Sequence, residues 1–300
     1  MEFYDIFVYF ATMIGIYSIL SLSLNLQYGF GGLVNFGLVA FFATGAYTGA
    51  LLAVNDVPFL LGIVAAGMVS ALLGFIVALP TSKLSVSYWA ICTLGIGEVV
   101  RLFLLNEEWL TKGSFGIAGI PRPWEDFWGD TYYSFFYLFF VWFFVGLAYL
   151  LIWRLSNSPF GRILKAVREE DDLALAMGKP VFIAKLKTMA LGASMAGIAG
   201  ALYAYYITYI SPSDFTPMIT FLVWSMVIIG GKGNILGSIA GATIIVVFYN
   251  STRYLKDFLD FPAETLASLR MVAIGLLIIL TVLYKPDGIL KEKEKRYPLD

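Results

Sequence analysis

The sequence predicts an all-α membrane protein, built as a polytopic bundle of about nine transmembrane helices. Hydrophobic residues make up 59% of the 300-residue chain and charged residues only 14%, and the charge lies almost entirely in links between long apolar stretches. These stretches are roughly 15–25 residues long, the length that a helix needs to span the hydrocarbon core of a bilayer. They are continuously apolar and do not alternate, as strands of an outer-membrane barrel would. We therefore expect residues 1–300 to form a single transmembrane domain.

The first five predicted segments follow the apolar runs to the middle of the chain. The first should be retained, because the N-terminus Met-Glu-Phe-Tyr-Asp is acidic and lacks the basic start of a cleaved signal peptide. Short links with Asp56 and Lys83 separate the next three, and a long link at about 106–131 precedes the fifth. The five segments are 6–26, 30–54, 58–79, 84–105 and 132–153.

Four more segments follow a charged link, and small residues mark the first of them. Gly192, Ala196 and Gly200 recur there at four-residue spacing, as Gly45 and Gly49 do in the second segment of the chain. In a bilayer such stripes let two helices approach closely, so we interpret them as packing faces. The four segments are 186–208, 216–230, 235–251 and 268–284.

Basic residues predict which ends of these helices face the cytoplasm. Seven lysines and arginines lie in the link 154–187 and five in the tail 285–300, so the positive-inside rule makes both cytoplasmic. Counting back across five segments then puts the N-terminus outside. Lys83 and Lys232 fall on inside links in this count, whereas Asp56 and the long acidic link fall outside. We expect an external N-terminus and a cytoplasmic C-terminus.

Composition excludes several kinds of site. The net charge of −1 gives no reason to expect a nucleic acid partner. Cys92 is the only cysteine and histidine is absent, which removes disulfides, Cys- or His-based metal sites and histidine bases. The chain also lacks a Gly-x-x-x-x-Gly-Lys-Ser/Thr loop and a visible nucleophile–base set. We therefore expect a transport subunit that is not an enzyme and has no cofactor or metal of its own.

Two glycine clusters stand where predicted segments begin at the inside face, one in each half of the chain. The first holds Gly29, Gly31 and Gly32, and the second holds Gly231 and Gly233. Paired breaks in corresponding halves indicate a transport site or gate, although two ordinary tight turns would give the same pattern. We predict that a solute path runs beside these clusters, because helix breaks free backbone groups for a passing solute.

Polar residues within the apolar segments are candidates for lining that path. Asn35, Thr44 and Tyr47 follow the first cluster. Glu98 and Arg101 are the only charged residues well away from a segment end, and their i,i+3 spacing puts them on one helix face. A charge inside a membrane is costly and therefore suggests function. Because Arg101 can snorkel to the nearby outer end, we favour a structural pair at the outer mouth over a substrate contact.

The link at about 158–180 predicts a short amphipathic helix or helix pair on the cytoplasmic face. Ser158 can cap a helix, Pro159 suits its first position, and Gly178 suits a C-terminal cap. Basic residues come first and acidic residues second. We interpret this segment as a docking element for a soluble partner, with a solvated connector as the alternative. The residues expected to carry the docking are Arg162, Arg168, Glu169, Glu170, Ala174 and Gly178.

Six stretches together carry a family resemblance. They are Leu22–Leu26, Ala40–Tyr47, Thr93–Arg101, Gly113–Pro121, Ala196–Ala204 and Pro286–Leu290. In this order they resemble the permeases of the branched-chain amino acid family, which serve importers powered by ATP-binding cassettes. The outer Gly-Ile-Pro loop is similar to the M-type permease subunit rather than its H-type partner. One departure is Leu173-Ala174-Leu175-Ala176, where the family more usually has a run like Ala-Ala-Glu-Ala.

The resemblance implies one subunit of a heteromeric importer in the plasma membrane of a prokaryote. Two permeases would cross the membrane, two ATPases with bound ATP-Mg would dock at the 158–180 link, and an extracytoplasmic binding protein would deliver the solute. That solute would be a branched-chain or related neutral amino acid, with urea, short amides or another small solute as the alternative. The sequence leaves open whether the second permease is a different chain or a copy.

An ion-coupled secondary transporter or channel is the rival from a different class. Such proteins usually place several acids, or a lysine or histidine, in the middle of the membrane. One glutamate beside one arginine, without any histidine, argues against that class.

Overall fold

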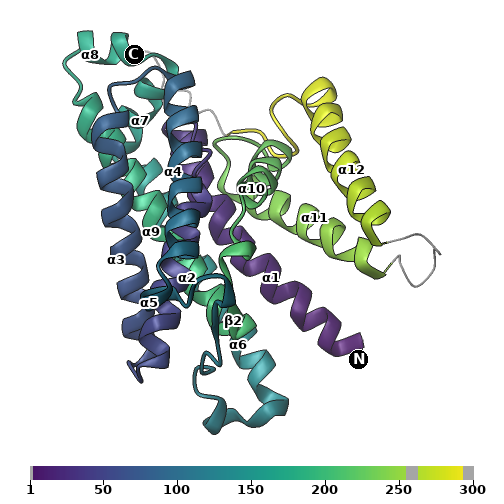
Figure 1. Cartoon of the computed structure of the whole chain (residues 1–300). Helices are drawn as coiled ribbons and strands as arrows, with labels where there is room; N and C mark the ends of the chain where they lie inside the picture. Colours follow the sequence, from purple (N-terminus) through teal and green to yellow (C-terminus); the bar gives the residue numbers. More distant parts are fainter. Residues whose placement is uncertain (1–2, 255–262, 293–300) are drawn as a thin grey trace.

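The computed structural model describes residues 3–254 and 263–292, where the chain forms a bundle of helices with one pair of two-residue strands (Figure 1). The predicted tail therefore lies within the described residues only as far as Glu292, and its last three basic residues lie outside them. The long helices are α1 (Phe3–Leu24), α2 (Leu38–Val54), α3 (Phe59–Thr81), α4 (Val86–Asn106), α6 (Glu125–Ser156), α9 (Val181–Ile207), α10 (Pro217–Gly230), α11 (Ile235–Tyr254) and α12 (Ala263–Tyr284). The short elements are η1 (Asn25–Phe30), α5 (Glu108–Thr111), η2 (Gly113–Phe115), β1 (Ile117–Ala118), α7 (Pro159–Glu169), α8 (Asp171–Ala176), β2 (Tyr209–Ile210) and η3 (Pro212–Asp214).

Several of these helices could cross a membrane by length and composition. Six described stretches are long and apolar enough, and three shorter apolar helices accompany them. The six are Tyr4–Phe30, Phe59–Thr81, Val86–Asn106, Tyr132–Ser156, Val181–Ile207 and Pro212–Gly230. The three are Leu38–Val54, Ile235–Ser251 and Ser268–Tyr284. The predicted class, an all-α membrane bundle, is confirmed.

One predicted helix, 30–54, is wrong in its first part. Its helix, α2, begins only at Leu38, and the residues between Phe30 and Leu38 run without regular structure through the interior. Instead α1 continues into the π-helical turn η1, and the chain then leaves the helix at 31–37, which we call the first break. The second break, 231–234, separates α10 from α11. Gly32 has φ +70°, a left-handed conformation that glycine adopts without a steric penalty. The glycine cluster therefore lies before the helix rather than inside it.

Close packing of α2, α3 and α9 forms the centre of the bundle, and small residues make it possible. A Cβ atom built on Gly45 would lie 2.1 Å from the carbonyl oxygen of Gly197, and one on Gly200 would lie 2.1 Å from that of Phe42. Side chains at these points would force the helices apart, because such distances are far inside van der Waals contact. The predicted packing stripes are confirmed.

Links that the charge pattern assigns to one side of the membrane meet at one end of the bundle. The first break, the α3–α4 loop, α7 and α8 all border a common hollow. At the opposite end β1 and β2 pair antiparallel, with Ile117 opposite Ile210. Figure 1 shows α7 and α8 at one end and the β2 region toward the other.

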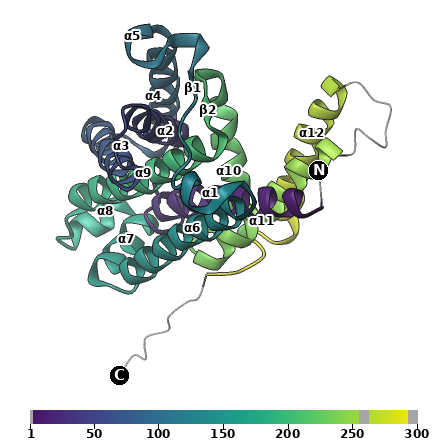
Figure 2. The same cartoon turned by 90° about the horizontal axis from the view of Figure 1, so that it is seen from below.

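The last helix, α12, stands at the edge of the bundle, where it contacts α10 and α11. Both views show it apart from α2, α3 and α9 (Figures 1 and 2). The chain after α12 turns back toward the end of α10. There the backbone N–H of Ile289 donates to the oxygen of Ile229 at 2.9 Å, and that of Leu290 donates to Gly230 at 3.1 Å. The tail is thus held against the second glycine cluster.

Candidate functional site: a coupling segment beside two helix breaks

The segment 158–180, which the sequence predicts to dock a partner and which we call the coupling segment, is a helix pair. The Ser158 hydroxyl accepts a hydrogen bond from the Gly161 N–H at 3.4 Å, and Pro159 occupies the first turn of α7. Extended backbone at Glu170 separates α7 from α8. Gly178 follows α8 with φ +71°, the conformation expected of a residue that ends a helix. Local capping chemistry therefore sets both ends of the segment, as the sequence predicts.

The outward face of this segment is apolar around α8. Leu173 is 56% exposed, and Leu175 and Met177 are exposed to a similar degree. We call these three residues the coupling surface. Ala174, between them, is only 1% exposed and packs inward. Exposed apolar side chains of this kind suit a contact with another protein, whereas Ala174 is not accessible to a partner.

Acidic and basic residues of the segment divide between solvent and interior. Arg162, Glu169 and Glu170 are exposed, in positions where a partner could reach them. Asp171 instead forms an ion pair with Lys185, a nearly buried residue in the first turns of α9. Sequence reasoning placed Lys185 in the charged link, but α9 begins at Val181 and includes it. This ion pair fixes the start of α8 against a membrane-spanning helix.

A hollow of about 750 Å³ lies beside the coupling segment. Its walls include Gly31, Gly32 and the α3–α4 loop on one side, and the acidic stretch Glu169–Asp172 on the other. It opens between the first helix break and the helix pair. A partner bound to α8 would therefore lie within reach of backbone that belongs to the first break.

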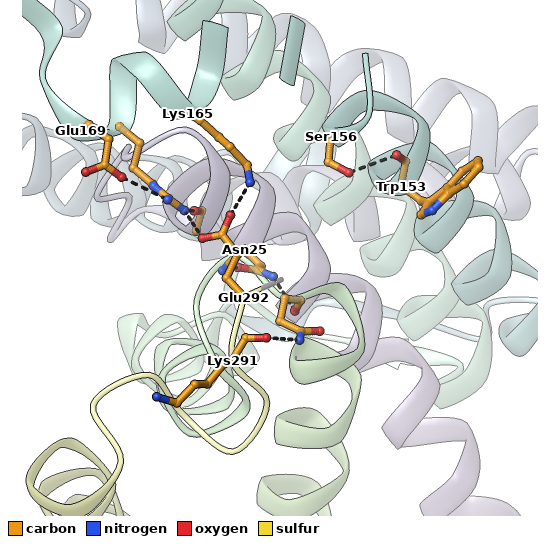
Figure 3. Close-up of polar contacts among 11 residues, drawn as sticks. Asn25, Trp153, Ser156, Lys165, Glu169, Lys291 and Glu292 are labelled. Atoms are coloured by element: carbon orange, nitrogen blue, oxygen red, sulfur yellow. Dashed lines mark hydrogen bonds and ion pairs between the residues drawn. The ribbon is translucent and has the colours of Figure 1, made fainter. Parts of the chain in front are cut away.

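The two glycine clusters, far apart in sequence, are in direct contact. Asn25 is completely buried, and its side-chain oxygen accepts a hydrogen bond from the Gly233 N–H at 2.9 Å. Its side-chain nitrogen donates to the backbone oxygen of Asn234, also at 2.9 Å. A Cβ atom on Gly29 would lie only 2.5 Å from the Gly233 nitrogen. The breaks form one structural unit, and Figure 3 shows Asn25 within it.

Asn25 was not among the residues singled out from the sequence. The signal that could have found it is a polar residue within the apolar run Leu24-Asn25-Leu26. A polar side chain buried in a membrane protein commonly forms hydrogen bonds with neighbouring backbone groups.

Asn35 fixes the backbone of the first break through its hydrogen bonds. It is fully buried, its side-chain nitrogen donates to Gln27 Oε1 at 2.7 Å, and its side-chain oxygen accepts from the Gly37 N–H at 2.8 Å. Its backbone oxygen accepts from the Trp224 indole N–H of α10 at 3.0 Å. Both ends of the amide are therefore engaged within the chain.

Two other predicted path residues lie on α2. The Thr44 hydroxyl donates to the Ala40 oxygen one turn earlier, at 2.8 Å. Tyr47 is buried against Phe215, and its hydroxyl has no hydrogen-bond partner among the described residues. Of these two side chains, Tyr47 is the one with a free polar group in the interior.

Glu98 and Arg101 form the pair that their spacing predicts. Arg101 Nε donates to both carboxylate oxygens of Glu98, at 3.0 and 3.1 Å. The side chains remain 40% and 24% exposed respectively.

A second cavity, of about 790 Å³, opens between α1, α9, α10, α11 and α12. Aromatic and aliphatic residues make up most of its wall, including Phe36 beside the first break and Trp224 on α10, and Asp214 is among the polar residues that line it. It is large enough for a small solute. None of the five predicted path residues lines this cavity or the hollow beside the coupling segment.

The described residues hold no cluster of three or more His, Cys, Asp or Glu side chains that could bind a metal ion. Polar chemistry in this part of the chain is hydrogen bonding and ion pairing between helices, links and breaks.

Comparison with known proteins identifies the family. A family model described as the permease component of the branched-chain amino acid transport system matches residues 6–282. The high-affinity branched-chain amino acid transport system permease protein LivM of Salmonella typhimurium is 34% identical, across 93% of this chain and 69% of that protein. The probable LivM permease of Methanocaldococcus jannaschii is 31% identical, across 93% and 91% of the two chains.

The M-type resemblance is also supported. LivH of Salmonella typhimurium is 26% identical over 94% of both chains, less than the LivM proteins. No solved structure gave a significant match. The match to the family model covers almost every helix described above, and this chain therefore belongs to the branched-chain amino acid transport permease family.

Proposed function

We propose that this chain is one permease subunit of an importer driven by ATP-binding cassettes, and that it carries branched-chain or related neutral amino acids across a prokaryotic plasma membrane. Family membership supports the transport role. The observation that carries the ATP-driven mechanism is the helix pair α7–α8, which presents an apolar coupling surface outside the membrane-spanning helices. Its exposure suits a soluble partner that binds from one side.

The proposed topology has nine spans, an external N-terminus and a cytoplasmic C-terminus. The six long and three shorter apolar helices support the count. The meeting of the α3–α4 loop, α7 and α8 at one end supports a common cytoplasmic side, because these elements carry the basic residues of the positive-inside rule.

The proposed complex has two ATPases below the membrane, a second permease beside this one and a binding protein outside. The ATPases would bind ATP-Mg and contact the coupling surface together with Arg162, Glu169 and Glu170. Alternating access then follows from movement of the coupling segment relative to the breaks. The partly exposed Glu98–Arg101 pair suits a position against another protein chain or water, because an ion pair facing lipid would be costly.

The proposed solute path runs past the first break and through the larger cavity. The hydrogen bond from Trp224 to Asn35 supports this route, since it joins the cavity wall to the break. Tyr47, whose hydroxyl has no partner among the described residues, does not line this cavity and adds no support to the route. Asn35 and Thr44 would act there chiefly by holding backbone in place.

The decisive experiment is reconstitution of the permease with the ATPases, second permease and binding protein encoded beside it. Radiolabelled leucine should enter proteoliposomes only when ATP is present with the ATPases. Urea and acetamide, tested in parallel, separate the alternative solutes. Uptake that needs an ion gradient and no ATPase would instead favour the secondary transporter.

A further inference from the structure

Arg168 is the residue through which the coupling segment reaches the helix breaks. It lies in the last turn of α7, and its Nη1 donates to the backbone oxygen of Gly29 at 2.6 Å. The same nitrogen donates to Glu292 Oε2 at 2.8 Å, while Nη2 contacts Glu169 at 3.2 Å on the solvent side. One guanidinium therefore joins α7, the first break and the tail. A charged donor to a buried carbonyl is among the stronger hydrogen bonds in proteins.

Glu292 comes from the tail and completes this contact. Its Oε1 lies 2.6 Å from Lys165 Nζ, so both carboxylate oxygens face basic residues of α7. Burial alone would raise its pKa, but hydrogen bonds and charges from Lys165 and Arg168 lower the pKa below its ordinary value. The carboxylate is thus charged at neutral pH. A depressed folded-state pKa means that its stabilising effect is lost only as the pH falls through that lowered value.

The tail connects this ion pair to the second break. The side chain of Asn234 donates to the backbone oxygen of Lys291 at 2.7 Å, next to Glu292 (Figure 3). Further along, Leu290 donates to the oxygen of Gly230 at 3.1 Å. The tail is therefore bonded to α7 at one point and to the second break at two others.

Two glycines provide the space for this arrangement. A Cβ atom on Gly32 would lie 3.0 Å from Arg168 Cα. One on Gly233 would lie 2.7 Å from Glu292 Oε2 and 3.2 Å from Arg168 Nη1. Both glycines have positive φ, of +70° and +74°. Any side chain at these positions would displace the ion pair or the breaks, so the glycines of both clusters leave the space in which α7 and the tail pack.

We propose that Arg168 and Glu292 are positioning residues that transmit movement of the coupling segment to both helix breaks together, with the tail 286–292 as the connecting strap. The inference rests on the proposed function, in which ATPases move α7 and α8. Because Asn25 bonds the two breaks to each other, a displacement of α7 acts on them as one unit. The coupling surface itself takes no part in these contacts, so a change at Glu292 should leave docking intact.

The test uses Glu292→Gln, which removes the charge and keeps the shape of the side chain. In the reconstituted complex we expect ATPases to co-purify as in the parent and to hydrolyse ATP, while uptake per ATP hydrolysed falls about fivefold or more, within the range of coupling between sites. Glu292→Asp, which keeps the charge, should recover most of the ratio. Glu125→Gln is the matched control, because this carboxylate pairs with Arg122, at 2.9 Å, at the start of α6.

Hydrogen exchange of the purified permease alone provides a readout that needs no partner. In Glu292→Gln we expect faster exchange of backbone amides in both 29–35 and 231–235, with Glu125→Gln unchanged. Exchange at the parental rate in either segment, or an unchanged ratio of uptake to ATP hydrolysis, would overturn the proposal. If the parental complex fails to transport with ATP, the proposed function fails, and the exchange experiment still tests the link between tail and breaks.

Discussion

At the scale of single residues, buried side-chain amides hold irregular backbone in place. Asn25 and Asn35 are both fully buried and together bond three backbone groups near the breaks as donors or acceptors: Gly233 N–H, Asn234 oxygen and Gly37 N–H. These backbone groups cannot form hydrogen bonds with lipid. Each side-chain amide therefore supplies the hydrogen-bond partner that water would supply outside the membrane.

Replacing Asn25 with Ala should destabilise the permease by about 1–3 kcal/mol for each buried backbone group left without a partner. The Gly233 N–H loses its acceptor in this variant. Asn55→Ala is the control, because the Asn55 side chain is exposed and bonds only to Leu51 of its own helix. Thermal unfolding in detergent measures the difference, and equal midpoints for the two variants would contradict this account.

At the scale of elements, close packing and partner docking occur on different helices. The centre, α2 with α9, depends on glycine–backbone contact, whereas α8 is six residues long and offers its side chains outward. The α2–α9 contact sets the stability of the bundle, and the exposed side chains of α8 suit a reversible contact with another protein.

Gly45→Val should push α2 and α9 apart, because its Cβ would meet the Gly197 oxygen at 2.1 Å. We expect loss of folded protein in a detergent extraction followed by gel filtration. Gly146→Val on α6 is the matched control, since none of the described atoms lies within 4 Å of a Cβ there. Similar yields for the two variants would show that the helix contact tolerates a larger side chain.

Leu175→Glu should weaken ATPase binding about tenfold or more, because it places a charge in the apolar coupling surface beside existing acids. Leu175→Met, which keeps the surface apolar, should bind like the parent. Co-purification at graded ATPase concentrations measures the change. Undiminished capture by Leu175→Glu would move the docking site elsewhere on the molecule.

How much the sequence could predict differs between these elements. Apolar length and capping residues predict the helices and the α7–α8 pair, because both signals are local. The contact of Glu292 with Arg168 could not be predicted, since 124 residues separate them and nothing near Glu292 marks a buried role. Helix 30–54 was misjudged because its apolar run continues through a glycine break, and hydropathy does not register backbone conformation.

At the scale of the whole molecule, charged links divide between the two ends of the bundle. The structure brings together the α3–α4 loop and the coupling segment, while the strand pair lies at the opposite end. We predict the sidedness in the membrane from the basic residues.

Cysteine labelling should verify this arrangement in a background where Cys92 is replaced. Trp109→Cys, in the long outer link, should react with an impermeant maleimide in intact cells, since this position is 80% exposed. Lys83→Cys, in the exposed α3–α4 loop, should react only after permeabilisation. The opposite pattern would invert the topology and remove the docking proposal.

The bond between Asn25 and Gly233 also bears on biosynthesis. It joins residues 208 positions apart, so the first break emerges from the ribosome long before its partner exists. Until α10 and α11 have inserted, the Asn25 amide must be satisfied by water or by the insertion machinery. A chain that stops after Ile207 should therefore keep the Asn25 amide without its partners at Gly233 and Asn234. We expect membrane proteases to degrade it, even though its helices α2, α3 and α9 are complete.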